Sequence, residues 1–163
     1  MKRAGQISAL GASFAMAACT PSAEISSDEL NSGLVDGTTA ARLFANVCGG
    51  SFPELFDYLS AVVNGQYERK TRTNSFEHLQ LELGFRYKEG RRKSSCEMQF
   101  KSSDEPLYLA LFIPGTVPGS GAVKINEDTG FARRHLSDSV TLTFEPAKTP
   151  AKRHSVRIDE VMQ

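Results

Sequence analysis

The first nineteen residues constrain the fold most, because they decide how much of the chain can enter a core and in which compartment it folds. Lys2 and Arg3 precede a short apolar run that ends in small residues, and Cys19 follows at once. This order is typical of a bacterial export signal. The apolar run is shorter than the roughly 20 residues of a membrane-spanning helix, which favours a leader that is removed. We therefore expect residues 1–18 to be a signal peptide.

The leader can be cut in two ways. Residues 16–19 resemble a lipobox, the motif at which bacterial lipoprotein precursors receive lipid on the cysteine and are cut in front of it, although Met16 stands where leucine is usual. The alternative is ordinary cleavage after Ala17, where residues 15–17 read A-x-A. Either cleavage places the folded chain outside the cytoplasm, where disulfides form and persist.

The number of cysteines favours lipidation. The chain has three cysteines, and an unpaired thiol in an exported protein needs an explanation. Lipid on Cys19 leaves Cys48 and Cys96 as a pair. Thr20 stands where many lipoproteins of the inner membrane have Asp, so resemblance to that sorting rule favours the outer membrane.

Composition divides the rest of the chain into three parts. Residues 19–37 are polar, acidic and rich in Ser and Gly. They bury too little to offset the entropy of ordering, so we expect a flexible tether behind the lipidated cysteine. Residues 38–146 hold the apolar patterning and are expected to fold as one α+β domain. Residues 147–163 are expected to form a polar tail with little order, with a short element at residues 156–161 as the alternative.

Two amphipathic helices are expected at the start of the domain. The first covers about residues 38–48, with Asp36 or Thr38 as its N-cap. The second covers about residues 52–64 and begins with a capping box at Ser51. Each helix has a single apolar stripe and must therefore pack against another element.

Strict alternation of apolar and polar residues predicts two paired strands. Residues 79–87 alternate, and residues 94–101 alternate in the same way with Cys96 on the apolar face. If residues 89–90 form a two-residue turn, Leu83 lies opposite Cys96. A one-residue slip would set apolar residues against polar ones, so the parity of the register is well determined.

The second half of the domain predicts more strands. Residues 107–113 read LYLALFI, are followed by Pro114, and predict a central strand covered on both faces. Further strands are expected at residues 122–126, 131–136 and 140–144. The predicted fold is α+β, with two N-terminal helices packed on an antiparallel sheet of five or six strands.

Cys48 and Cys96 are expected to form a disulfide inside this core. Cys48 lies on the apolar face of the first helix and Cys96 on that of a strand, and the helix must cover this strand face. The alternative is a reactive or metal-binding thiol pair, but the chain has no C-x-x-C and no histidine at ligand spacing. We expect no metal ion and no cofactor.

Residue types that often carry chemistry are scattered, and we interpret them as structural. Residues 115–121 are rich in glycine, but no helix follows to complete a phosphate site, so a flexible connection is expected. The histidines expected at the surface are His78, His135 and His154. The carboxylates that could serve glycosidic chemistry, but are expected on a solvated face, are Glu77, Glu82 and Glu97.

Basic residues gather in four short clusters, at residues 69–72, 91–93, 133–134 and 152–153. Such clusters are typical of turns and sheet edges, where charge deters strand-to-strand aggregation. The alternative is contact with anionic envelope polymers or lipid headgroups.

Residues 44–100 resemble a set of small exported proteins of alphaproteobacteria that are largely uncharacterised. The shared pattern is F-x-x-x-C at Phe44 and Cys48, then Pro53, and a later C-x-x-x-F at Cys96 and Phe100. The resemblance supports the cysteine pairing and a helix-then-sheet order, and it implies no activity.

These features predict an exported, lipid-anchored protein of the cell envelope that acts as a non-enzymatic binding or accessory module. Its expected partners are the membrane, through lipid on Cys19, and an envelope protein or polymer. Nucleic acid is not expected, because the chain is exported and its formal net charge is +0. The alternatives are a soluble periplasmic or secreted inhibitor or stress protein, and an envelope hydrolase with an unrecognised site.

Overall fold

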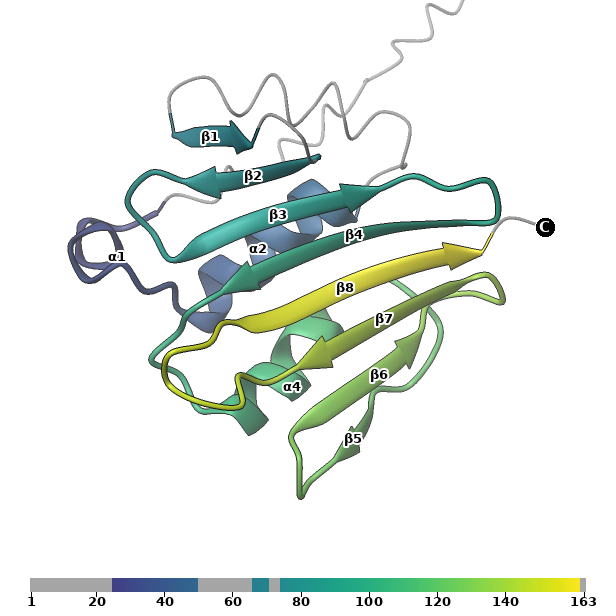
Figure 1. The fold of residues 1–163 in the computed structure, drawn as a ribbon. Coiled ribbons are helices and arrows are strands. Elements are labelled where there is room, and N and C mark those ends of the chain that lie inside the picture. Colours follow the sequence, from purple (N-terminus) through teal and green to yellow (C-terminus); the bar gives the residue numbers. More distant parts are fainter. Residues whose placement is uncertain (1–24, 50–65, 71–73, 162–163) are drawn as a thin grey trace, which may run out of the picture.

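The computed structural model describes residues 25–49, 66–70 and 74–161. In these residues the chain forms three α-helices and one antiparallel sheet of eight strands (Figure 1). The helices are α1 (Ser27–Ser32), α2 (Gly37–Cys48) and α4 (Pro106–Thr116). The strands are β1 (Tyr67–Lys70), β2 (Ser75–His78), β3 (Leu83–Lys88), β4 (Lys93–Phe100), β5 (Lys124–Asn126), β6 (Phe131–His135), β7 (Val140–Glu145) and β8 (His154–Val161). The prediction of two N-terminal helices on five or six strands is therefore wrong. The helix predicted at residues 52–64 lies outside the described residues.

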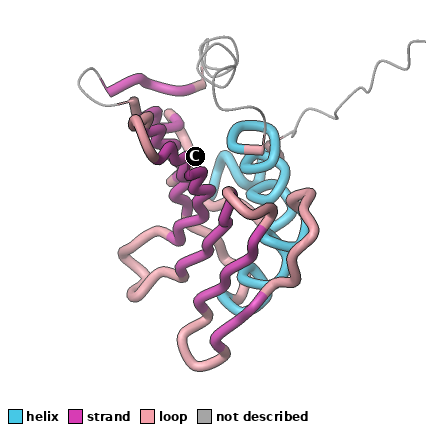
Figure 2. The backbone as a smooth tube through the Cα atoms, turned by 90° about the vertical axis from the view of Figure 1, so that its right-hand side faces the viewer, coloured by secondary structure: helices cyan, strands magenta, loops and turns pink. Residues whose placement is uncertain are grey.

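Two successive four-stranded meanders build the sheet. Its order is β1-β2-β3-β4-β8-β7-β6-β5, so β4 and β8 pair at the centre and join the two meanders. α2 contacts β4 and β8, α4 contacts β6 and β7, and the two helices pack together on the same face of the sheet (Figure 2). The opposite face, the open face, lies away from both helices.

α2 confirms the first predicted helix. Asp36 caps it by accepting a hydrogen bond from the Thr39 backbone amide at 2.6 Å, as expected for an N-cap side chain. Gly49 follows the last helical residue and donates to the Ala45 carbonyl. The stripe that α2 turns toward the sheet includes Phe44, which is fully buried.

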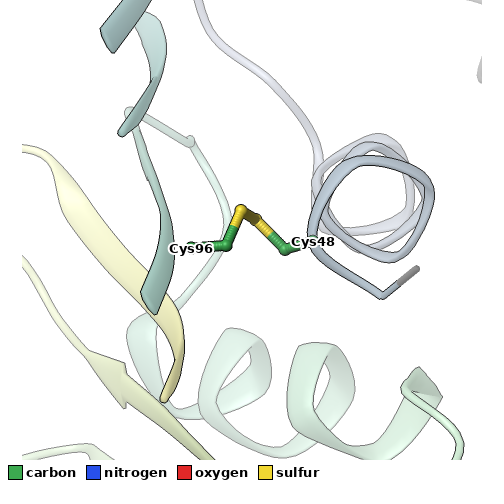
Figure 3. The surroundings of a disulfide bond; sticks show 2 residues. All are labelled: Cys48 and Cys96. Atoms are coloured by element: carbon green, nitrogen blue, oxygen red, sulfur yellow. A yellow bond between two sulfur atoms is a disulfide. The ribbon is translucent and has the colours of Figure 1, made fainter. Parts of the chain in front are cut away.

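The disulfide between Cys48 and Cys96 joins the end of α2 to the inner face of β4 (Figure 3). The two Cα atoms are 5.5 Å apart, within the usual range for a disulfide. Both side chains are buried. The predicted pairing is confirmed, and the bond ties the helix layer to the centre of the sheet.

The predicted central strand at residues 107–113 is wrong, because this segment is the helix α4. An apolar run without periodicity does not distinguish a buried strand from a buried helix. Pro106 takes the first helical position, where its missing amide costs nothing, and Leu and Ala are strong helix formers. Leu109 and Ile113 are fully buried against the sheet, and Pro114 lies in the last turn.

The predicted hairpin has the right parity but the wrong register. Leu83 pairs with Phe100, four residues further along β4 than the predicted partner Cys96, which instead faces Tyr87. The connection is therefore longer than a two-residue turn. β3 also begins only at Leu83, because residues 79–82 form the connection from β2, in which Leu81 is buried and Leu79 is 62% exposed.

The polar tail predicted at residues 147–163 is wrong for residues 154–161, which form the central strand β8; the alternative of an element at residues 156–161 is the better prediction, although the strand is longer. β8 pairs with β4 along its whole length and with β7. Val156 and Ile158 point into the core and alternate with polar residues on the open face. Because the alternating apolar stretch is short and charged residues surround it, its place in the sheet depends on pairing with distant strands.

The flexible tether predicted for residues 19–37 is wrong for its described part, residues 25–37. α1 begins with a capping box, in which Glu29 accepts from the Ser26 amide at 2.9 Å while Ser26 accepts from the Glu29 amide. Burial alone would raise the pKa of Glu29, but hydrogen bonds from the Asp36 and Ser26 amides hold it below its usual value. Val35 is 1% exposed and adds to the core, so the ordered chain begins before the predicted domain boundary.

Candidate functional site

The open face of the sheet is polar and carries an ordered array of charge. Cross-strand pairing places four basic side chains, together with Glu97 and Thr143, in one row across β3, β4, β8, β7, β6 and β5. The basic members of this cationic row are Arg86, Arg157, Arg133 and Lys124. Arg86, Arg133 and Lys124 are exposed. The row therefore presents exposed positive charge toward its two ends, at Arg86 on one side and at Arg133 and Lys124 on the other, while Glu97 and the Arg157–Asp159 pair lie between them.

Neighbouring groups fix some of these side chains in place. Asp159 accepts from Arg157 at 3.0 Å and pairs with Lys93 at 3.2 Å. Glu97 accepts from Gln99 at 2.9 Å and from Ser155 at 2.7 Å. Such pairs on a surface contribute little stability, but they hold charged groups in defined positions.

A polar pocket of about 470 Å³ opens where β2 ends and β8 begins. Arg153 lies in its wall, where one guanidinium nitrogen is 2.6 Å from Glu77 and another is 3.1 Å from Glu82. Burial by itself would lower the pKa of Arg153, but the two carboxylates outweigh it and raise this pKa above its ordinary value. The guanidinium therefore stays charged and connects the β2 end to the start of β8.

Two of the three histidines are buried, so their predicted surface location is wrong. His78 is 7% exposed, and its Nδ1 accepts from the Gln80 and Leu81 amides at 3.1 and 3.0 Å. His154 is 6% exposed, and its Nδ1 accepts from the Ala147 amide at 3.1 Å. Burial lowers the pKa of both rings, in keeping with two neutral imidazoles that accept hydrogen bonds.

His135 is exposed, as predicted. Its Nδ1 lies 3.2 Å from the Thr141 hydroxyl on the neighbouring strand.

The glycine-rich segment predicted as a flexible connection is held by a single side chain. Arg134 points from β6 toward α4 and donates to the carbonyls of Pro114, Val117, Gly119 and Gly121 at 2.6–2.7 Å. It thereby ties the end of α4, where carbonyls lack helical partners, to the loop that follows. A Cβ at Gly121 would collide with the backbone of β6, so this close approach requires glycine.

The structure brings together some of the candidate residues and separates others. Glu77 and Glu82 meet at Arg153, whereas Glu97 is bound to neighbours on β4 and β8. Arg153 and Arg134 were visible in the sequence only as members of basic clusters, and no spacing identified their roles. Cys19 lies outside the described residues.

The described part of the chain holds no group of three or more His, Cys, Asp or Glu residues arranged to bind a metal ion. Within the same residues, no helix is long and apolar enough to cross a membrane. Comparisons with protein-family models, curated proteins and solved structures give no match.

Proposed function

We propose that this chain is an exported, lipid-anchored protein of the cell envelope, and that it acts as a binding module through the open face of its sheet. The observation that carries the proposal is the buried Cys48–Cys96 disulfide. Such a bond is typical of proteins that fold outside the cytoplasm. It also leaves Cys19, directly after the leader-like segment, as the third cysteine of the chain.

The open face supports binding as the activity of the module. Its cationic row crosses six strands and is supported by a rigid sheet whose two central strands pair over eight residues. Charge arranged on a rigid surface favours an acidic partner and increases the rate of encounter. An acidic envelope partner is therefore the expected ligand.

Cell fractionation of a Cys19→Ala variant tests the anchor. The wild-type chain should be recovered with membranes, and the variant should move to the soluble envelope fraction, because no lipid can be attached. Thr20→Ala is the matched control, since it leaves the lipobox-like residues intact, and it should remain with membranes. Unchanged membrane recovery of Cys19→Ala would show that lipidation is the wrong explanation.

Photocrosslinking in cells tests the binding face. A crosslinker at exposed Arg133 or Lys124 on the open face should capture a defined partner. The matched control is exposed Thr116 on α4, on the other side of the sheet, and it should not capture the same partner. Equal capture from all three positions would argue against the open face as the binding surface.

A further inference from the structure

The helix layer carries an exposed apolar patch. Among the described residues only five large hydrophobic side chains are strongly exposed, and three of them lie on α4: Leu107, Tyr108 and Leu111, at 45%, 43% and 54% exposure. Phe112 extends the group, because its ring stacks on Tyr108 with centroids 5.2 Å apart. These four residues are the α4 patch. Single exposed apolar residues are ordinary, but a contiguous group marks an interaction site.

The α4 patch faces away from the sheet. Leu109, Ala110 and Ile113 on the same helix are fully buried, and they occupy the side toward β6 and β7. A helix that is apolar on every side is normally covered on every side. The outer side of α4 therefore has the character of a surface that meets an apolar environment.

The start of α4 lies beside the start of α2, whereas α1 at the beginning of the described chain lies beside the connection of β2 and β3, where the Gly33 carbonyl accepts from the Glu82 amide. The Gly37 amide donates a hydrogen bond to the carboxylate of Asp104, which shortly precedes α4, at 2.6 Å. A Cβ atom at Gly37 would lie 2.9 Å from the Tyr108 ring. The described chain begins at Ile25, which packs against the core only six positions after Cys19. Six extended residues reach about 20 Å at 3.3–3.6 Å per residue. Lipid on Cys19 would thus hold the domain close to the bilayer.

We propose that the α4 patch inserts into the headgroup region of the membrane that holds Cys19, so that the helix layer faces lipid and the open face points away. This inference rests on the proposed lipid anchor. Leu and aromatic side chains are the types that enter the membrane interface. Asp104 and Glu105 at the start of α4 repel anionic headgroups, so the surface that fits the patch is zwitterionic lipid.

Fluorescence quenching on vesicles tests this orientation. The full precursor with Leu111→Cys is expressed in a bacterial host, purified from membranes without reductant, labelled with an environment-sensitive maleimide, and reconstituted into phosphatidylcholine vesicles that carry a shallow spin-labelled lipid. The maleimide then reacts only with the introduced cysteine, because Cys48 and Cys96 are bonded to each other and Cys19 carries lipid. Arg133→Cys on the open face is the matched control. Intact mass of the same samples reports whether Cys19 carries lipid.

The label at position 111 should be quenched several-fold more strongly than the label at position 133, and added anionic lipid should not increase the difference. Equal quenching in a lipidated sample would overturn docking of the patch and leave the anchor standing. Disulfide-linked dimers through position 111 before labelling, with no quenching of the labelled monomer afterwards, would overturn it in favour of a second copy of the chain. A mass without lipid would contradict the anchor and the docking together.

Discussion

Replacing Arg134 with methionine should loosen the attachment of α4 to the loop that follows it. The guanidinium donates four short hydrogen bonds, at 2.6–2.7 Å, to the carbonyls of Pro114, Val117, Gly119 and Gly121, and a longer one to the Gly115 carbonyl at 3.4 Å. Methionine keeps an apolar side chain of similar length but offers no donor. The change therefore removes the hydrogen bonds with little change in packing.

The expected cost follows from which carbonyls lose a partner. Those of Gly119 and Gly121 lie in the loop, where water can replace part of the bond, whereas Pro114 and Val117 are buried residues. Two such carbonyls left without a charged donor cost about 1 kcal/mol each. Loss of a cation at the end of α4 adds about 0.5 kcal/mol. The free energy of unfolding should fall by about 2–3 kcal/mol, which corresponds to about 5–10 °C in Tm for a domain of this size.

Thermal and urea unfolding of three variants measure this effect. Arg134→Met should show the full loss, and Arg134→Lys should recover less than half of it, because an ammonium cannot reach all four carbonyls. Arg133→Met is the matched control, because Arg133 precedes Arg134 in the sequence but is exposed on the open face. Its guanidinium carbon lies 5.7 Å from the centre of the Phe131 ring. This substitution should change stability by less than about 0.5 kcal/mol. If Arg134→Met and Arg133→Met have the same Tm, the role assigned to Arg134 is wrong.

Three further predictions concern the disulfide, the loop and a buried histidine. Cys96→Ala should lower the free energy of unfolding by up to about 4 kcal/mol in the chain-entropy model, and reductant should then have no further effect on urea unfolding; an unchanged midpoint would contradict it. Gly121→Ala should lower Tm, because the added methyl group meets the backbone of β6; an unchanged Tm would show that the loop is free to move. Burial lowers the pKa of His154, so below pH 6.5 the unfolded chain takes up a proton that the folded chain does not, and urea unfolding should show stability falling as pH drops from 7 toward 5. This pH dependence of stability should weaken in His154→Asn and persist in His135→Asn, where the replaced ring is exposed. Equal pH dependence in both variants would show that His154 is not its source.

Elements with a clear local signal were predictable from the sequence. α2 has an N-cap at Asp36 and one apolar stripe, and both were legible. β4 alternates strictly, so the inward side of Cys96, Met98 and Phe100 followed from the period. Because the cysteines lie on two apolar faces that must pack together, and lipid on Cys19 would leave them as a pair, the disulfide was predictable from the sequence.

Elements that depend on distant partners were not predictable in this way. The apolar run of α4 has no period, so its helical form is set by where it packs. β8 looks like a polar tail until β4 and β7 are present on either side of it. The alternation at residues 79–87 predicts an outward His78, but His78 ends the separate strand β2 and lies on the same inner face as Phe76.

The candidate site also combines residues that the sequence indicated with residues that only the fold brings together. The carboxylates of Glu77 and Glu82 were visible in the sequence, but Arg153, which joins them, is distant along the chain. The cationic row arises only from the register of six strands. Arg133 and Arg134 read as one basic pair, yet the alternation of β6 sends one to the open face and the other to α4.

Intact mass spectrometry of the chain purified from membranes, after alkylation without reductant, tests the central claim most directly. The account predicts residues 19–163 with lipid on Cys19 and no alkylated cysteine, because Cys48 and Cys96 are bonded to each other. A chain cut after Ala17 with an alkylated Cys19 would contradict the anchor. Alkylation of Cys48 and Cys96 would contradict the disulfide on which the assignment to an oxidising compartment depends.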